Sequence, residues 1–236
     1  MLSYAHGASD VPLLGETIGA NLERVVARSP QAEALVCRHQ RVRWSYRELN
    51  ERVDALARGL VAAGLQVGDR VGLWSPNCAE WVLVQFATAK AGVVLVNVNP
   101  AYRAMELEFA LRQSGCRMLV AARSFKTSDY AAMIADVRGE LPDLERVVLL
   151  GSPEWEQLAA GEQATADELR ARADALQFDD RSTSSTPVGR RAFPRARRSA
   201  TTTSSTTAIS SPRRAATARP TASASPCPSI TALAWS

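Results

Sequence analysis

The sequence predicts an α/β fold: a partial doubly wound, mostly parallel sheet with flanking helices, followed by a disordered tail. Three observations carry this prediction. Helical and strand patterns alternate along residues 1–180, the connections between them are short, and residues 93–100 form an almost continuous apolar run. Such runs are typical of strands covered on both faces, and repeated strand–helix–strand units place parallel strands side by side.

The first elements are a helix and two short strands. Residues 17–30 carry apolar side chains at helical spacing, with Thr17 as the expected N-cap. Residues 32–46 predict two strands that turn around His39 and Gln40.

A second helix is predicted over residues 45–64. It opens with a capping box, in which the side chains of Ser45 and Glu48 each accept a backbone N–H of the other residue, and it stops at Gly64. Its apolar residues recur at helical spacing and define the expected buried face: Leu49, Val53, Leu56, Leu60 and Val61.

The remaining elements alternate in type. Strands are expected at residues 69–75, 93–100, 116–122 and 145–151, and helices at residues 77–92, 104–115, 127–142 and 165–176. Gly92 and Gly115 stop two of these helices, because glycine readily takes the left-handed conformation that ends a helix.

Neither common phosphate-binding motif, GxGxxG or GxxxxGK[ST], occurs in the sequence. Glu106 and Glu108 are two residues apart on a helix, so they do not share a face and are expected to be solvated. His6 and His39 are the only imidazoles and are expected at the surface. Three aromatic residues are expected in the core rather than in a ligand platform: Trp74, Trp81 and Phe86.

The charge divides the chain into two parts. The net charge of +4 combines −5 over residues 1–180 with +9 over residues 181–236, where nine arginines occur without any acidic residue or lysine. We therefore predict a folded domain over residues 1–180 and a tail over residues 181–236 that lacks the apolar pattern needed to fold.

The four cysteines form no CxxC pair and are expected to be reduced thiols rather than disulfides or metal ligands. No apolar run reaches membrane-spanning length, and the N-terminus lacks the pattern of a signal peptide. A cytoplasmic location is the resulting expectation.

Several segments, in order, resemble the N-terminal part of AMP-forming acyl-CoA synthetases, and most closely the fatty-acyl-CoA synthetase branch. They are "PLLGETIGANLERVVARSPQAEALV", "WSYRELNERVDALARGLVAAGLQVGDRVGLWSPNCAEWVLVQFATAKAGVVLVNVNPAYRAMELEFALRQSGCRMLVAA" and "LPDLERVVLL". The resemblance covers nearly all of residues 1–180. It implies the first part of the adenylate-forming N-terminal domain.

The resemblance also implies chemistry: ATP-dependent adenylation of a fatty acid, then thioester formation with CoA, with Mg²⁺ assisting. The family's phosphate loop ends in Pro-Lys-Gly and should follow shortly after Asp180, but no Pro-Lys-Gly occurs. We therefore assign no catalytic, cofactor-binding or metal-ligating residue. The chain as translated is expected to be inactive and to bind ATP, CoA and Mg²⁺ poorly.

The composition of the tail suggests the hypothesis of a frameshift after Asp180. With codons that the genetic code allows, read one base earlier, Arg181–Thr186 can regroup to Ile-Asn-Ile-Gln-Tyr-Thr. Ser199–Ser210 can regroup to Leu-Ser-His-His-Asn-Ile-Leu-Asn-Asn-Gly-Tyr-Phe, and Pro226–Ser236 to Pro-Val-Pro-Phe-Tyr-His-Cys-Leu-Gly-Met-Val. These readings resemble consecutive segments of the same family, and loss of a single base would produce the observed tail.

Two alternatives remain. The tail could be a basic arm that binds nucleic acid or an acidic partner weakly and salt-dependently, attached to a non-enzymatic α/β module. Residues 1–180 could also fail to fold stably alone, because the sheet would expose an unpaired edge.

Overall fold

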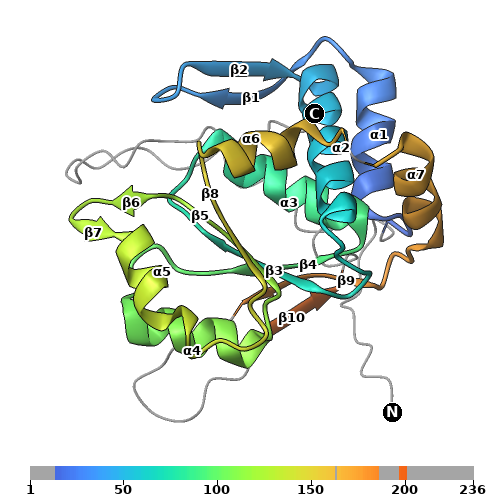
Figure 1. The fold of residues 1–236 in the computed structure, drawn as a ribbon. Helices are drawn as coiled ribbons and strands as arrows, with labels where there is room; N and C mark the ends of the chain where they lie inside the picture. The colour runs from blue at the N-terminus through green and yellow to red at the C-terminus, as the bar shows by residue number, and fades with distance from the viewer. Residues whose placement is uncertain (1–13, 163, 186–196, 201–236) are drawn as a thin grey trace, which may run out of the picture.

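The computed structural model describes residues 14–162, 164–185 and 197–200. Its centre is a six-stranded sheet of order β10-β9-β4-β3-β5-β8 (Figure 1). The strands from β9 to β8 are parallel, and β10 is antiparallel to β9. The strands are β3 (Arg70–Trp74), β4 (Val94–Asn97), β5 (Met118–Ala121), β8 (Arg146–Leu149), β9 (Arg181–Ser185) and β10 (Arg197–Ala200).

Helices cover both faces of the sheet, as the doubly wound prediction requires (Figure 1). One layer holds α1 (Ile18–Arg28), α2 (Tyr46–Ala62), α3 (Ala79–Ala91), α6 (Pro153–Ala160) and α7 (Ala166–Ala175). The other holds α4 (Ala104–Ser114) and α5 (Tyr130–Arg138). Each helix layer packs against one face of the sheet and forms a separate apolar cluster with it. Neighbouring residues of one strand, such as Leu95 and Val96, therefore pack into different clusters.

The predicted helix starts at Thr17 and Ser45 are confirmed. Thr17 Oγ1 accepts the N–H of Ala20 at 3.1 Å. Ser45 and Glu48 form the reciprocal capping box, with N–H···O distances of 3.3 and 2.8 Å. These contacts satisfy amide groups that have no partner inside the helix.

Two small hairpins lie outside the main sheet. The predicted pair β1 (Glu33–Cys37) and β2 (Val42–Ser45) is present and antiparallel. A second pair, β6 (Ser124–Phe125) and β7 (Ser128–Asp129), was not predicted and occupies the start of the expected helix at residues 127–142. That helix begins only at Tyr130, because Asp129 caps it by accepting the N–H of Ala132 at 3.1 Å.

The structure places a strand in the segment that we predicted as tail. Residues 181–185 form β9 and pair with β4 in parallel, although none of their side chains is apolar. Strand pairing uses backbone N–H and C=O groups, so it does not require apolar side chains. Residues 197–200 form β10. The other tail residues, 186–196 and 201–236, lie outside the described residues, as do His6 and Cys227.

A buried lysine joins three helices of the larger layer. The side chain of Lys90, on α3, is 2% exposed. Its ammonium group donates to Glu23 Oε1 on α1 at 2.7 Å, and to Asn50 Oδ1 and Asp54 Oδ1 on α2 at 2.9 and 2.6 Å. All three N–H groups of the ammonium therefore have acceptors, which offsets the cost of burying the charge.

Candidate functional site at the carboxyl edge of the sheet

The topology indicates where a ligand would bind. After β3 the chain enters α3 in one layer, whereas after the neighbouring β4 it enters α4 in the other (Figure 1). In doubly wound sheets, ligands bind at the carboxyl ends of strands where the connections diverge in this way. The candidate site is therefore the edge formed by the ends of β3, β4 and β9.

The β3–α3 connection is held from two sides. The Ser75 hydroxyl donates to the carbonyl oxygen of Pro76 at 2.9 Å and lies 3.4 Å from Cys78 Sγ. The first amide of α3, that of Ala79, donates to Gln40 Oε1 from the β1–β2 turn at 2.7 Å. Burial raises the pKa of Cys78 to about 11, so this thiol stays protonated at neutral pH and is a poor nucleophile.

The β4–α4 connection is fixed by two stacked aromatic residues. The rings of Trp74 and Tyr130 are stacked with their centroids 3.6 Å apart. Trp74 Nε1 donates to the carbonyl oxygen of Asn99 at 3.0 Å, and Tyr130 Oη donates to that of Pro100 at 2.5 Å. Burial raises the pKa of Tyr130 to about 12, so its hydroxyl remains a donor at neutral pH.

One polar atom at this edge has no partner among the described residues. Asn97 Oδ1, at the last residue of β4, is buried and accepts no hydrogen bond there. In the β4–β9 register Asn97 lies beside Ser185, the last residue of β9. Buried side-chain oxygens usually have partners.

Neither lysine of the chain belongs to the strands that form this edge. The sequence has only two lysines, Lys90 and Lys126. Lys90 is committed to its three acceptors, and Lys126 lies in the β6–β7 turn, over the Phe125 ring. Over the same part of the chain, no group of three or more His, Cys, Asp or Glu side chains could hold a metal ion.

Of the residues considered from the sequence, Trp74 lies at this edge as the last residue of β3, and the others form no cluster with it. Glu106 accepts the N–H of Arg103 at 2.9 Å as part of a helix cap, and Glu108 pairs with Arg112 at 3.1 Å. His39 is exposed, with Nδ1 3.4 Å from Cys37 Sγ. Trp74 is fully buried, and Trp81 and Phe86 pack against the core as partly buried residues.

The three described cysteines, Cys37, Cys78 and Cys116, are free and buried. This arrangement agrees with the expectation of reduced thiols for these positions. Among the described residues, no helix is both long and apolar enough to cross a membrane.

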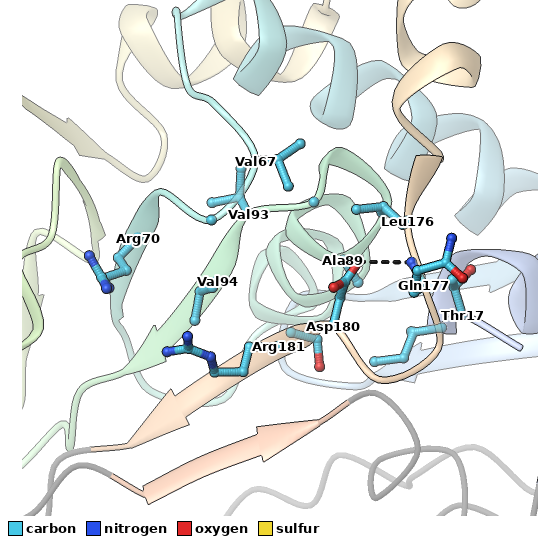
Figure 2. Close-up of a pocket in the computed structure, with 14 residues that line it drawn as sticks. Thr17, Val67, Arg70, Ala89, Val93, Val94, Leu176, Gln177, Asp180 and Arg181 are labelled. Atoms are coloured by element: carbon cyan, nitrogen blue, oxygen red, sulfur yellow. Dashed lines mark hydrogen bonds between the residues drawn. The ribbon is translucent and has the colours of Figure 1, made fainter. Parts of the chain in front are cut away.

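A cavity of about 190 Å³ lies at the opposite, amino-terminal end of the strands. Its walls include Val94 on β4 and Leu176 after α7 (Figure 2). Ser182 on β9 also lines it. The Asp180 carboxylate closes one side by accepting the N–H of Gln177 at 2.8 Å. The cavity is thus separate from the carboxyl edge.

The fold agrees with the family that the sequence matches. Residues 22–208 match the AMP-binding enzyme family, and the chain belongs to that family.

Curated relatives carry acyl-CoA ligase names. The human protein "Medium-chain acyl-CoA ligase ACSF2, mitochondrial" is 41% identical over 191 residues, which cover 75% of this chain and 31% of the relative. "Putative acyl-CoA synthetase YngI" of Bacillus subtilis is 36% identical over 131 residues, or 56% of this chain and 24% of the relative. This chain thus spans about a third of the length of the human relative.

Solved structures show the same fold. The inhibitor-bound N-terminal domain of FACL13 from Mycobacterium tuberculosis is 26% identical with a TM-score of 0.68, covering 79% of this chain and 44% of that one. A long-chain-fatty-acid-CoA ligase (FadD1) from Archaeoglobus fulgidus has a TM-score of 0.69 at 18% identity, covering 85% of this chain and 40% of that one, and supports the fold alone.

Proposed function

We propose that residues 14–185 are the scaffold of the first part of a fatty-acyl-CoA synthetase, and that the chain as translated does not form acyl-adenylates. The observation that carries this proposal is the carboxyl edge itself. β3, β4 and β9 end side by side there, where the connections after β3 and β4 diverge. The sequence after β9, however, contains no Pro-Lys-Gly and no lysine.

Lysine matters here because adenylation develops negative charge on phosphate oxygens. A positioned cation stabilises such charge, and its removal typically slows an enzyme by orders of magnitude. The two lysines of the chain are held elsewhere, on α3 and in the β6–β7 turn. ATP, CoA and Mg²⁺ therefore belong to the proposed activity of the uninterrupted family sequence, and we expect weak binding of each by this chain.

The composition of residues 181–236 supports a frameshift as the origin of this loss. Three segments of the tail regroup, in order, into readings that resemble the family's strand, its phosphate-site segment and its substrate-pocket segment. On this proposal the acyl-adenylating residues are encoded by the gene but are not present in the translated chain.

Two measurements test the proposal. Independent sequencing across the Asp180 codon should reveal one missing base, and an unchanged sequence would overturn the frameshift. The purified chain, supplied with ATP, Mg²⁺ and octanoate or palmitate, should release no pyrophosphate above the level without fatty acid. The matched control is the protein expressed from the frame-restored gene, which should release pyrophosphate. Turnover by the chain as translated would overturn inactivity.

The charge of the tail favours a second candidate function, a basic arm on a non-enzymatic module. Its +9 charge would bind nucleic acid with an affinity that falls steeply with salt. Titration of a labelled random DNA duplex at 50 and 150 mM salt separates the two proposals. Tight binding at 150 mM salt would favour the arm. A cytoplasmic location remains a proposal, which fractionation of cells that express the tagged gene would test.

A further inference from the structure

The strand β9 combines an interior position with an entirely polar sequence. It lies between β4 and β10, and its residues are Arg-Ser-Thr-Ser-Ser. Strands inside parallel sheets are normally rich in Val, Ile and Leu, because helices cover both of their faces. The neighbouring strand β4 follows this rule with Val-Leu-Val-Asn. The sequence of β9 therefore does not match its place in the fold.

The mismatch is sharpest at Ser182. This residue is 6% exposed, and its Oγ is buried without a hydrogen-bond partner among the described residues. Because Leu95 pairs with Thr183, the preceding residues Val94 and Ser182 also lie side by side. A hydroxyl with no partner loses its hydration on burial and gains nothing in return. An aliphatic side chain would not incur that cost.

Ser182 is also one of the residues that line the cavity of about 190 Å³ at the amino end of the sheet. Its lining combines polar and charged residues, among them Arg70, Gln177 and Asp180, with five aliphatic ones: Ile18, Val67, Val93, Val94 and Leu176. A branched aliphatic residue could extend into this space and gain contacts that serine cannot make.

We propose that position 182 is a packing position suited to a branched aliphatic side chain, and that serine occupies it because the reading frame has shifted. This inference rests on the frameshift in the proposed function. In the regrouped reading Ile-Asn-Ile-Gln, the last two bases of the first isoleucine codon are the first two bases of the Ser182 codon. The last two bases of the second isoleucine codon are likewise the first two bases of the Ser184 codon. Residues two apart point to the same face of a strand, so both isoleucines face the same way.

The alternation gives independent support. The regrouped asparagine and glutamine coincide with Thr183 and Ser185, on the opposite face of β9. The codon argument thus assigns apolar residues to one face only, and the structure finds the buried, partnerless hydroxyl on that same face. Neither observation depends on the other.

The decisive experiment compares Ser182→Val with Ser182→Thr in the full chain. The two side chains have the same shape and the same β-branching, and they differ only in a methyl against a hydroxyl. We expect the melting temperature of the valine variant, followed by circular dichroism, to exceed that of the threonine variant by about 2–4 °C.

Thr183→Val is the matched control, because it makes the same exchange on the opposite face. It should change the melting temperature by less than about 1 °C. If the valine variant at position 182 melts at or below the temperature of the threonine variant, position 182 does not favour an aliphatic side chain and the proposal is overturned. An equal gain at position 183 also overturns it, since strand propensity would then explain both changes.

A third variant covers the case in which valine prevents folding. Ser182→Ala removes the hydroxyl without adding bulk, and it should melt no lower than the unsubstituted chain. A lower melting temperature would show that the hydroxyl is used and would contradict the inference. Sequencing across the Asp180 codon distinguishes this inference from the proposed frameshift. An intact reading frame would contradict the frameshift, whereas a stabilising valine would still support an aliphatic preference at position 182.

Discussion

Trp74 and Tyr130 stack with their ring planes only 5° apart, and each donates a hydrogen bond to one of two successive carbonyl groups. Their acceptors, Asn99 and Pro100, follow β4 at the carboxyl edge. The side chains of Trp74 and Tyr130 are fully buried, whereas Asn99 is exposed and Pro100 is partly exposed. One aromatic pair from β3 and α5 thus sets the course of the chain beside the candidate site.

Tyr130→Phe keeps the ring stack and removes only the donor to Pro100. We expect the free energy of unfolding to fall by about 1 kcal/mol, because the carbonyl oxygen of Pro100 loses its hydrogen bond from the tyrosine hydroxyl. Urea denaturation gives this value. Combining the change with Trp74→Phe should cost less than the sum of the two, since both donors hold the same loop. Strict additivity would show that the two bonds act independently.

The Lys90 cluster predicts an order of effects. The side chain of Glu23 is 60% exposed and that of Asp54 is 31% exposed, although both lie within 2.7 Å of the same ammonium group. Asp54→Asn should therefore destabilise the fold by about 2–3 kcal/mol, while Glu23→Gln should cost under about 1 kcal/mol. Urea midpoints measure both. A larger loss for the glutamate variant would contradict the roles assigned by exposure.

The contact between α2 and α6 leaves no room for a side chain at Gly59. A Cβ there would lie 1.9 Å from the carbonyl oxygen of Leu158. A Cβ at Gly161, just after α6, would likewise lie 1.9 Å from the carbonyl oxygen of Ala55 on α2. Gly59→Ala should therefore displace α6 and cost about 3 kcal/mol, despite the better helix propensity of alanine. Gly139→Ala is the control, because nothing lies within 4 Å of its Cβ position and its φ is −64°. That change should be neutral or stabilising.

Alkaline pH should destabilise the fold. Burial raises the pKa values of Cys78 and Cys116 to about 11 from 9.0. Because the unfolded thiols ionise first, the stability present below pH 9 is lost as the pH rises toward 11. Urea midpoints between pH 8 and pH 10.5 should decline, and Cys116→Ala should make the decline shallower. An unchanged decline in that variant would assign the effect to other groups.

Most of the fold could be predicted, because local signals at helix ends agree with the long-range packing. Ser45 with Glu48, Gly92 and Gly115 fixed three helix boundaries. α6 was missed although Ser152, Pro153 and Gly161 are ordinary start and stop signals. Its position against α2 could not be read from the sequence, since a glycine inside a helix does not say which backbone approaches it.

β9 and the candidate site show a different limit. An all-polar strand has no periodicity to detect, so only pairing with β4 reveals β9. The candidate site at the carboxyl edge cannot be located until the strand order and the two helix layers are known, because its position depends on where the connections diverge. The stacking of Trp74 on Tyr130 joins residues 56 positions apart, beyond the reach of a local pattern.

The burial of Lys90 has a practical consequence for anyone who labels this protein. Lys126 is the other lysine of the chain; it is exposed and adopts a φ of 54° in the β6–β7 turn. An amine-directed fluorophore on the native protein will therefore meet one accessible side-chain amine among residues 14–162, 164–185 and 197–200. Because β6 and β7 come directly before α5, a dye on that amine would sit close to the helix that carries Tyr130.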